Sequence, residues 1–393
     1  MARRVAVVGT GQTYFMTRRK DASAPELVYE ATTRALQDAE LSVKDIDSVV
    51  FGIAPEAFMG VNCPDKWVSD GAGALNKPFF RVHTGGATGG SAVIAAVEQV
   101  ASGVADVVLA VAMDRVGQTP VAQRVLGLIW DPIFATGLSL NLITVTAMLN
   151  AAMMEKYGYT EWHTAKLASK NHKNALNNPY AHLKVDVSVE DVLKSPVLSW
   201  PIKLLEVCPS SDGACAVIVA TEEKARKITS TPAWVSGMAG YTYVSTPGNE
   251  DVTVERGIAL DVRKAYRMAG IDNPRQQIDV AEPYMPFSFV EISAYVQFGF
   301  AKDMKEAIKM VDDGFGEMTG EVPFAPSGGV LCANPIGCTA MVRVAEAAIQ
   351  IMGKGGEHQV PGAKVAVAQG QGGSMAPASA TFSNVFVLAK EPR

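Results

Sequence analysis

The chain has 393 residues, of which 48% are hydrophobic and 19% are charged, and it contains 35 glycines. This profile is typical of a compact α/β enzyme and excludes wholesale disorder, collagen and coiled coil. With 35 Lys and Arg against 40 Asp and Glu, the formal net charge is −5, so no nucleic acid is expected as a partner. Five scattered cysteines do not form a disulfide framework and favour a cytoplasmic protein.

One weakly charged stretch raises the question of a membrane span. Residues 125–154 carry a single charge, Asp131, but Gly137, Asn141 and several hydroxyl groups interrupt the run. A spanning helix needs about 20 predominantly apolar residues. We therefore predict no membrane insertion, and instead a buried or dimer-facing segment with a hydrophobic helix near residues 144–154.

Short apolar runs alternate with helical patterns along the first part of the chain. The pattern predicts strands at residues 5–8, 47–51 and 106–111, a helix at 24–38, and a helix after the glycine-rich turn at 83–90. Such alternation predicts βαβ units on a largely parallel sheet.

The same pattern recurs later and indicates an internal duplication. Strands are predicted at 234–239, 279–282 and 364–368, and a helix at 340–351 follows the turn at 327–329. We interpret residues 1–116 and 200–230 as an N-terminal half and 231–393 as a C-terminal half. Residues 117–199, rich in Met, Asn, Leu and aromatic residues, are interpreted as a loop domain over the active site.

Few motifs point to chemistry by themselves. The turn at 9–13 lacks the third glycine of a dinucleotide fingerprint, which argues against nucleotide redox chemistry. The four glycines of 83–90 precede a helix and suit a developing negative oxygen, although a plain turn explains them equally well. We interpret Cys208 and Cys215 as core thiols and His172 as a structural histidine, and the chain shows no spacing typical of a metal site.

Six segments in the same order resemble the thiolase superfamily, specifically its sterol-carrier-protein-type and archaeal-type members. They are residues 8–13, 101–106, 171–181, 208–214, 326–329 and 372–374. The resemblance runs nearly end to end and implies an α/β, five-layered αβαβα fold of two duplicated halves with a loop-domain insertion, usually dimeric. It also implies an acyl-CoA acyltransferase that uses coenzyme A, which we expect to bind near Ser210, Ser211, Asp212 and Gly213.

All four catalytic positions of the family are changed. Gly86 stands where the nucleophilic cysteine is expected, Tyr284 and Asn334 stand at the positions of the second and third motifs, and Gly370 at that of the fourth. Gly86 and Gly372 retain the backbone N–H groups that match the oxyanion hole of the family. We therefore predict an active enzyme in which Tyr284 handles the proton, rather than a non-catalytic scaffold that binds coenzyme A.

The resemblance implies cleavage between the α and β carbons of a β-oxygenated acyl-CoA. A β-ketone would be attacked directly by free coenzyme A, in the room that Gly86 leaves for a second thiol or an aryl ketone. A β-hydroxyl group would give a retro-aldol reaction, as in steroid side-chain aldolases. We rank thiolysis first, because the segments at 85–90 and 332–337 look most like the thiolase-fold subunit of 2-benzoylsuccinyl-CoA thiolase from anaerobic toluene degradation.

Two further expectations accompany this reading. Cys332 lies close to the Asn334 position and stays open as a displaced nucleophile. The resemblance also implies a homodimer core that pairs with a small OB-fold, zinc-ribbon subunit. No metal is expected in this chain itself.

Overall fold

The structure, a computed structural model, describes residues 3–130, 133, 140–243, 251, 253–254, 257–373 and 381–393. Part of the predicted apolar segment (131–132 and 134–139) and Ser374 of the last resembling motif lie outside the described residues. Within the described ranges, no helix is both long enough and apolar enough to cross a bilayer.

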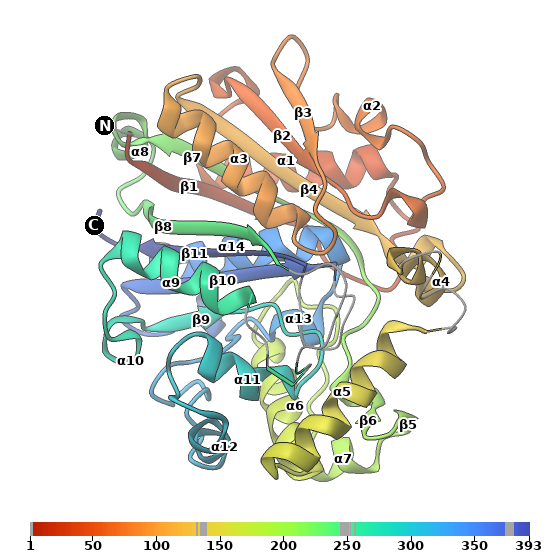
Figure 1. Cartoon of the computed structure of the whole chain (residues 1–393). Coiled ribbons are helices and arrows are strands. Elements are labelled where there is room, and N and C mark those ends of the chain that lie inside the picture. The colour runs from red at the N-terminus through yellow and green to blue at the C-terminus, as the bar shows by residue number, and fades with distance from the viewer. Residues whose placement is uncertain are drawn as a thin grey trace.

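In the part of the chain that the structure describes, nine strands form one sheet in the order β3-β2-β4-β7-β1-β8-β11-β10-β9. Their bounds are β1 Val5–Gln12, β2 Ser48–Gly52, β3 Phe79–Val82, β4 Val107–Arg115, β7 Asp212–Thr221, β8 Ala233–Thr242, β9 Val280–Glu282, β10 Val365–Gly372 and β11 Phe382–Ala389. β1 and β8 run side by side near the middle of the molecule and join its two halves (Figure 1).

Helices cover the two halves of the sheet in three layers. α1 (Ala24–Asp38) packs on β1 and β7, and α9 (Gly257–Ala269) packs on β8 and β11. Between the halves, α3 (Thr88–Ser102) and α14 (Ile336–Met352) pack against each other and against strands of both halves (Figure 1). The resulting α-β-α-β-α order confirms the predicted five-layered α/β fold.

A repeated hydrogen-bond pattern supports the duplication. Just before β2, Asp47 Oδ2 accepts the N–H of Val107 at the start of β4, at 2.9 Å. Just before β9, Asp279 Oδ2 accepts the N–H of Val365 at the start of β10, at 2.8 Å. The same side chain thus ties the same pair of parallel strands in each half.

The sheet is mixed, so the prediction of a largely parallel sheet was wrong. Only the pairs β3–β2, β2–β4 and β9–β10 are parallel, and the other pairs between neighbouring strands are antiparallel. The chain reaches β7 through the long segment after β4 rather than through one crossover helix. It reaches β11 from β10 by a short connection, which suits an antiparallel pair.

The segment between β4 and β7 is mainly helical and extends below the sheet in Figure 1. It contains α4 Ala122–Leu126, α5 Leu142–Tyr157, α6 Glu161–Leu176, α7 Val189–Lys194 and the hairpin of β5 Val197–Ser199 and β6 Ile202–Lys203. The hydrophobic helix expected near residues 144–154 is α5, whose first N–H groups bond the side chain of Asn141. The domain boundaries given above stay a prediction.

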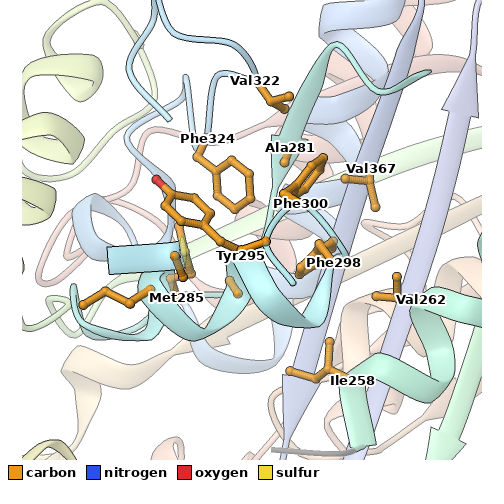
Figure 2. Packing of buried hydrophobic residues seen from close by; sticks show 14 of the residues in the cluster. Ile258, Val262, Ala281, Met285, Tyr295, Phe298, Phe300, Val322, Phe324 and Val367 are labelled. Carbon is orange, nitrogen blue, oxygen red and sulfur yellow. The ribbon is translucent and has the colours of Figure 1, made fainter. Parts of the chain in front are cut away.

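The C-terminal half has an aromatic core that packs beside Ala281 of β9 and Val367 of β10 (Figure 2). Tyr295 and Phe324 meet edge to face with ring centroids 4.8 Å apart, and Phe300 and Phe324 also meet edge to face, with centroids 5.5 Å apart. Met285 belongs to the same cluster and anchors the segment that follows β9. The shorter helices around this core and elsewhere are α2 Pro64–Val68, α8 Glu222–Ile228, α10 Pro274–Gln277, α11 Val290–Gln297, α12 Met304–Asp312 and α13 Gly329–Cys332.

Candidate functional site

Gly86 and Gly372 lie against each other at the boundary between the two halves. Gly86 precedes α3 and Gly372 ends β10. A β-carbon added to Gly372 would lie 2.2 Å from the main-chain nitrogen of Gly86 and 2.6 Å from that of Ala87. The two backbones can therefore meet only because position 372 has no side chain. The structure brings together the two glycines of the expected oxyanion hole, and their catalytic role stays a prediction.

Gly86 does not leave an open space. A β-carbon added there would lie 2.5 Å from the carbonyl oxygen of Gln371 and 3.2 Å from Tyr284 Oη. The main chain of β10 and a phenol therefore fill the place of the missing side chain. The expectation that Gly86 provides room for a second thiol or an aryl ketone was wrong at this position.

Tyr284 follows β9 and points its hydroxyl group at this place. Its main-chain N–H donates to Gln369 Oε1 on β10 at 2.8 Å, and its O–H donates to Asn334 Oδ1 at 3.3 Å. Burial raises the pKa of Tyr284 above its usual value, and Cys208 and Asp114 act in the same direction. The phenol is therefore neutral at neutral pH, so it can donate a proton but is a poor base.

The Asn334 amide is held from both ends. Its Oδ1 also accepts the hydroxyl hydrogen of Thr339 at 2.8 Å, and its Nδ2 donates to Cys208 Sγ at 3.0 Å. Each end of the amide therefore has a side-chain partner, because the oxygen accepts from two hydroxyl groups and the nitrogen donates to the thiol. Tyr284, Asn334 and Cys208 thus form one hydrogen-bonded group beside Gly86.

Cys208 is a residue of this group that the sequence did not reveal. It was expected to be a core thiol, but it is only partly buried and it contacts Asn334. Burial raises the pKa of its thiol to about 11, with the Asn334 amide opposing the shift. The signal was its place at the start of the resembling segment 208–214.

Cys332 lies on α13 and faces α6 instead. Its Sγ is completely buried, 3.5 Å from the carbonyl oxygen of Asn171 and 3.7 Å from His172 Nδ1. Burial also raises the pKa of this thiol strongly. His172 itself bonds the carbonyl oxygen of Leu205 through Nε2, as expected of a structural histidine.

The four residues expected to bind coenzyme A divide into one exposed and three buried positions. Ser210 is exposed, whereas Ser211, Asp212 and Gly213 are buried. Asp212 accepts the N–H of Gly117 at 2.7 Å and that of Arg19 at 3.0 Å, so its carboxylate holds neighbouring loops. The role of these residues in binding coenzyme A stays a prediction.

Asp114, at the end of β4, is a second residue that the sequence did not reveal. Its buried carboxyl group accepts the N–H of Cys338 at 3.1 Å and that of Ala54 at 3.3 Å. Burial raises its pKa well above the usual value. The bond to Cys338 fixes the first turn of α14, four residues after Asn334. The sequence feature that could have indicated Asp114 is its place directly after the apolar run of the predicted strand.

Metal binding has no support in the described part of the chain. There, no group of three or more His, Cys, Asp or Glu side chains could hold a metal ion.

Two family descriptions match the sequence. "Thiolase, N-terminal domain" matches residues 5–195, and "Thiolase C-terminal domain-like" matches residues 240–384. Acetyl-CoA acetyltransferase of Methanothermobacter thermautotrophicus is 30% identical over 375 residues, which cover 95% of this chain and 97% of that protein. Sterol carrier protein 2 of Homo sapiens is 30% identical over 387 residues, covering 93% of this chain and 69% of that protein.

Solved structures share the fold at lower sequence identity. The "Ltp2-ChsH2(DUF35) aldolase" superposes with a TM-score of 0.83 at 24% identity, covering 100% of this chain and 99% of that one. A monomeric SCP2-thiolase-like protein from Mycobacterium smegmatis has a TM-score of 0.74 at 20% identity, covering 100% and 78%. Human mitochondrial 3-ketoacyl-CoA thiolase in complex with CoA has a TM-score of 0.71 at 16% identity, covering 100% and 99%.

Proposed function

Because the chain belongs to the thiolase family, we propose that it cleaves the bond between the α and β carbons of a β-ketoacyl-CoA, with free coenzyme A as the acceptor and no covalent acyl-enzyme. The family, and with it the class of acyl-CoA acyltransferase, is confirmed by the relative that is 30% identical over 95% of the chain. The substrate and the absence of a covalent acyl-enzyme are our proposal.

A single observation carries the proposal. Tyr284 Oη lies 3.2 Å from where a β-carbon at Gly86 would stand, and the carbonyl oxygen of Gln371 would lie 2.5 Å from it. A side chain at position 86 could not carry an acyl group without displacing main chain. The group that occupies this place is a proton donor, not a nucleophile.

The proposed step balances without an acyl-enzyme. The coenzyme A thiolate attacks the β-carbonyl carbon, the bond between the α and β carbons breaks, and its electron pair passes to the enolate of the departing acyl-CoA. The backbone N–H groups at Gly86 and Gly372 are proposed to stabilise that enolate oxygen, a contribution typically worth several kcal/mol where water is excluded. Coenzyme A enters as its thiolate, having released its thiol proton to solvent. Tyr284 donates its hydroxyl proton to the α carbon of the enolate, and the phenolate that remains regains a proton from solvent.

A retro-aldol reaction on a β-hydroxyacyl-CoA is the second candidate. It is favoured by the likeness to the "Ltp2-ChsH2(DUF35) aldolase", which aligns over the whole chain. This reaction needs a base to take the β-hydroxyl proton. Burial raises the pKa of Tyr284, so its phenolate, the form that could act as that base, is scarce at neutral pH. The neutral phenol therefore suits thiolysis better. A non-catalytic scaffold that binds coenzyme A is the third reading.

Product analysis separates the three readings. We propose 2-benzoylsuccinyl-CoA as the first substrate to test, with benzoyl-CoA and succinyl-CoA as products, and a panel of other β-ketoacyl-CoA and β-hydroxyacyl-CoA esters beside it. Thiolysis is expected to consume one coenzyme A and give two acyl-CoA esters. A retro-aldol reaction would give one acyl-CoA and a carbonyl compound without added coenzyme A. Binding of coenzyme A by calorimetry with no cleavage of any ester would support the scaffold.

We also propose that the chain forms at least a homodimer. β3 is an edge strand of the sheet, and Phe80 on it is 42% exposed. Leu128 and Met148, within the weakly charged stretch, are 72% and 66% exposed. An exposed apolar side chain on an edge strand favours association, and so do the exposed apolar residues of the turn and helix that carry Leu128 and Met148. Light scattering at micromolar concentration should give at least twice the chain mass, and a clean monomer, as described for one structural relative, would contradict it.

A small OB-fold, zinc-ribbon subunit is proposed as a further partner. The name of the "Ltp2-ChsH2(DUF35) aldolase" indicates a two-component assembly, and this supports the proposal by analogy alone. Any zinc would then belong to the partner.

A further inference from the structure

The loop that carries Asn334 has a strained backbone. Ile336, two residues later, has a φ of 33°, in the left-handed region that a β-branched residue rarely adopts. Such a conformation persists only where surrounding contacts determine it. Asp114 supplies one contact by accepting the N–H of Cys338. The other side of the loop is held by groups that the proposed reaction does not use.

A chain of hydrogen bonds leads from the surface to the main chain of Asn334. The exposed Thr17 places its Oγ1 3.0 Å from His182 Nε2, and His182 Nδ1 lies 2.9 Å from Ser211 Oγ. Ser211 Oγ in turn accepts the main-chain N–H of Asn334 at 3.1 Å. Ser211 is completely buried, so its hydroxyl group depends on these partners.

The peptide group fixes one of these bonds. The N–H of Asn334 can only donate, so Ser211 Oγ accepts there. His182 Nδ1 is the side-chain partner of the same oxygen: it accepts the Ser211 hydroxyl hydrogen in one tautomer of the ring and donates to the oxygen in the other. Without a polar group at the place of Nδ1, the buried Ser211 hydroxyl would lose this partner, and the oxygen would be free to turn away from Asn334.

The main chain of the same segment supports this arrangement. The N–H groups of His182 and Leu183 donate to the carbonyl oxygen of Cys332 at 3.0 and 2.9 Å. The N–H of Ser211 donates to the carbonyl oxygen of Asn334 at 3.3 Å. Main-chain hydrogen bonds thus hold the loop on both sides of Ala333, and the His182–Ser211 bond adds a contact between side chains.

We infer that His182 is a positioning residue for the cleavage reaction. Through Ser211 it fixes the main chain of Asn334, and thereby the Oδ1 that accepts the Tyr284 hydroxyl hydrogen at 3.3 Å. The inference rests on the proposed function, because it is the proton donor of that reaction that His182 positions. His182 acts through two other residues and not on the substrate.

Two substitutions distinguish the effect of the polar group at His182 Nδ1 from the effect of the volume of the ring. His182→Asn keeps a polar acceptor near the place of Nδ1, whereas His182→Leu fills a similar volume without one. His182→Leu is expected to lower kcat about 10- to 100-fold with KM for coenzyme A changed little, because a misplaced catalytic group costs rate rather than binding. His182→Asn is expected to keep most of the wild-type kcat.

Two further variants act as controls. If His182 acts through Ser211, the double variant with Ser211→Ala should lose no more activity than Ser211→Ala alone, because residues in one chain of contacts are not additive. His163→Leu removes another histidine, whose ring contacts Thr160 and Asp312, and should leave kcat unchanged. Should His182→Leu not fold, Ser211→Ala removes one oxygen and tests the same bond.

Crystal structures of the two His182 variants give a readout that does not depend on turnover. The bond between Tyr284 and Asn334 is expected to be lost in His182→Leu and kept in His182→Asn. If the wild type cleaves no ester, the proposed function fails, and the structures still decide whether His182 positions Asn334. Equal losses of kcat in both variants, a change confined to KM, or an unchanged Tyr284–Asn334 bond in His182→Leu would overturn the inference.

Discussion

Tyr284→Phe is expected to lower kcat by about 10²–10⁴-fold, the usual contribution of a general acid or base. The substitution removes only the phenol oxygen, which donates to Asn334 Oδ1 and lies 3.2 Å from the place of the missing Gly86 β-carbon. The ring can stay buried, and the main-chain N–H keeps its bond to Gln369. Affinity for coenzyme A, measured by calorimetry, should change little because the lost interaction acts on the transition state.

The pH dependence of the wild type offers a second check on the same residue. Because burial raises the pKa of Tyr284 above its usual value of about 10, the phenol should stay protonated across the physiological range. Loss of kcat from its deprotonation should therefore begin only above about pH 10. A kcat that instead rises with pH, along an acidic limb that disappears in Tyr284→Phe, would show that the deprotonated phenol acts as a base, which would favour the retro-aldol reaction.

Substitutions of Cys332 and Cys208 test whether a cysteine, rather than Tyr284, carries the reaction. Cys332→Ala should cost much less kcat than Tyr284→Phe, because the Cys332 thiol is completely buried against α6. Cys208 requires the same test, since its Sγ accepts from the amide that holds Tyr284. An acyl adduct on either cysteine in protein quenched during turnover, together with a nearly silent Tyr284→Phe, would contradict the mechanism and indicate a relocated nucleophile.

The internal duplication was predictable because local patterns repeat, whereas the layers were expected from the resemblance to the thiolase superfamily. Asp47 and Asp279 precede equivalent strands, and each fastens its strand to the next by the same bond. Strand direction was not predictable, because it depends on the route of the long helical segment between β4 and β7, which no local pattern encodes. Periodicity reports which face of a strand is buried but not which neighbour it pairs with.

The candidate site could be predicted only by comparing the motifs of this sequence with those of the thiolase superfamily. The resemblance brought Gly86, Tyr284 and Asn334 together as candidates, and the structure places them in one group. The sequence did not indicate Cys208 and His182 as site residues, because Cys208 contacts the side-chain amide of Asn334 and His182 reaches its main chain through Ser211. Such contacts join segments more than a hundred residues apart and leave no spacing in the sequence.

Changes at Gly86 should have the second large effect. The φ of Gly86 is not positive, so the backbone accepts an L-residue, and the obstacle is space. A β-carbon would lie 2.5 Å from the carbonyl oxygen of Gln371, which belongs to β10 and cannot turn aside as a flexible side chain would. Gly86→Ala is expected to cost about 1–3 kcal/mol of unfolding free energy, as overpacking does, and to lower kcat by at least about 100-fold through displacement of the adjoining catalytic groups.

Gly127→Ala is the matched control for this substitution. Gly127 has a φ of −67°, and an added β-carbon would come no nearer than 3.8 Å to a neighbouring atom. Denaturant unfolding should show Gly127→Ala as neutral or slightly stabilising, by up to about 1 kcal/mol, and kcat should not change. A large loss in both glycine variants would point to a general effect of alanine rather than to the contact at Gly86.

Gly86→Cys tests whether the acyl-enzyme is absent because residue 86 lacks a thiol or because the surrounding residues leave no space for one. The cysteine carries the same β-carbon as alanine, so the two variants should lose kcat to a similar degree if space alone controls position 86. Intact-mass spectrometry of Gly86→Cys quenched with substrate should then find no acyl adduct, since the β-carbon of that cysteine already lies 2.5 Å from the carbonyl oxygen of Gln371 and 3.2 Å from Tyr284 Oη. An adduct on the new cysteine, with turnover above that of Gly86→Ala, would mean that the site still supports the covalent route. In that case the absence of an acyl-enzyme in the wild type would follow from the identity of residue 86 alone, and not from the packing of Tyr284 and Gln371 around it.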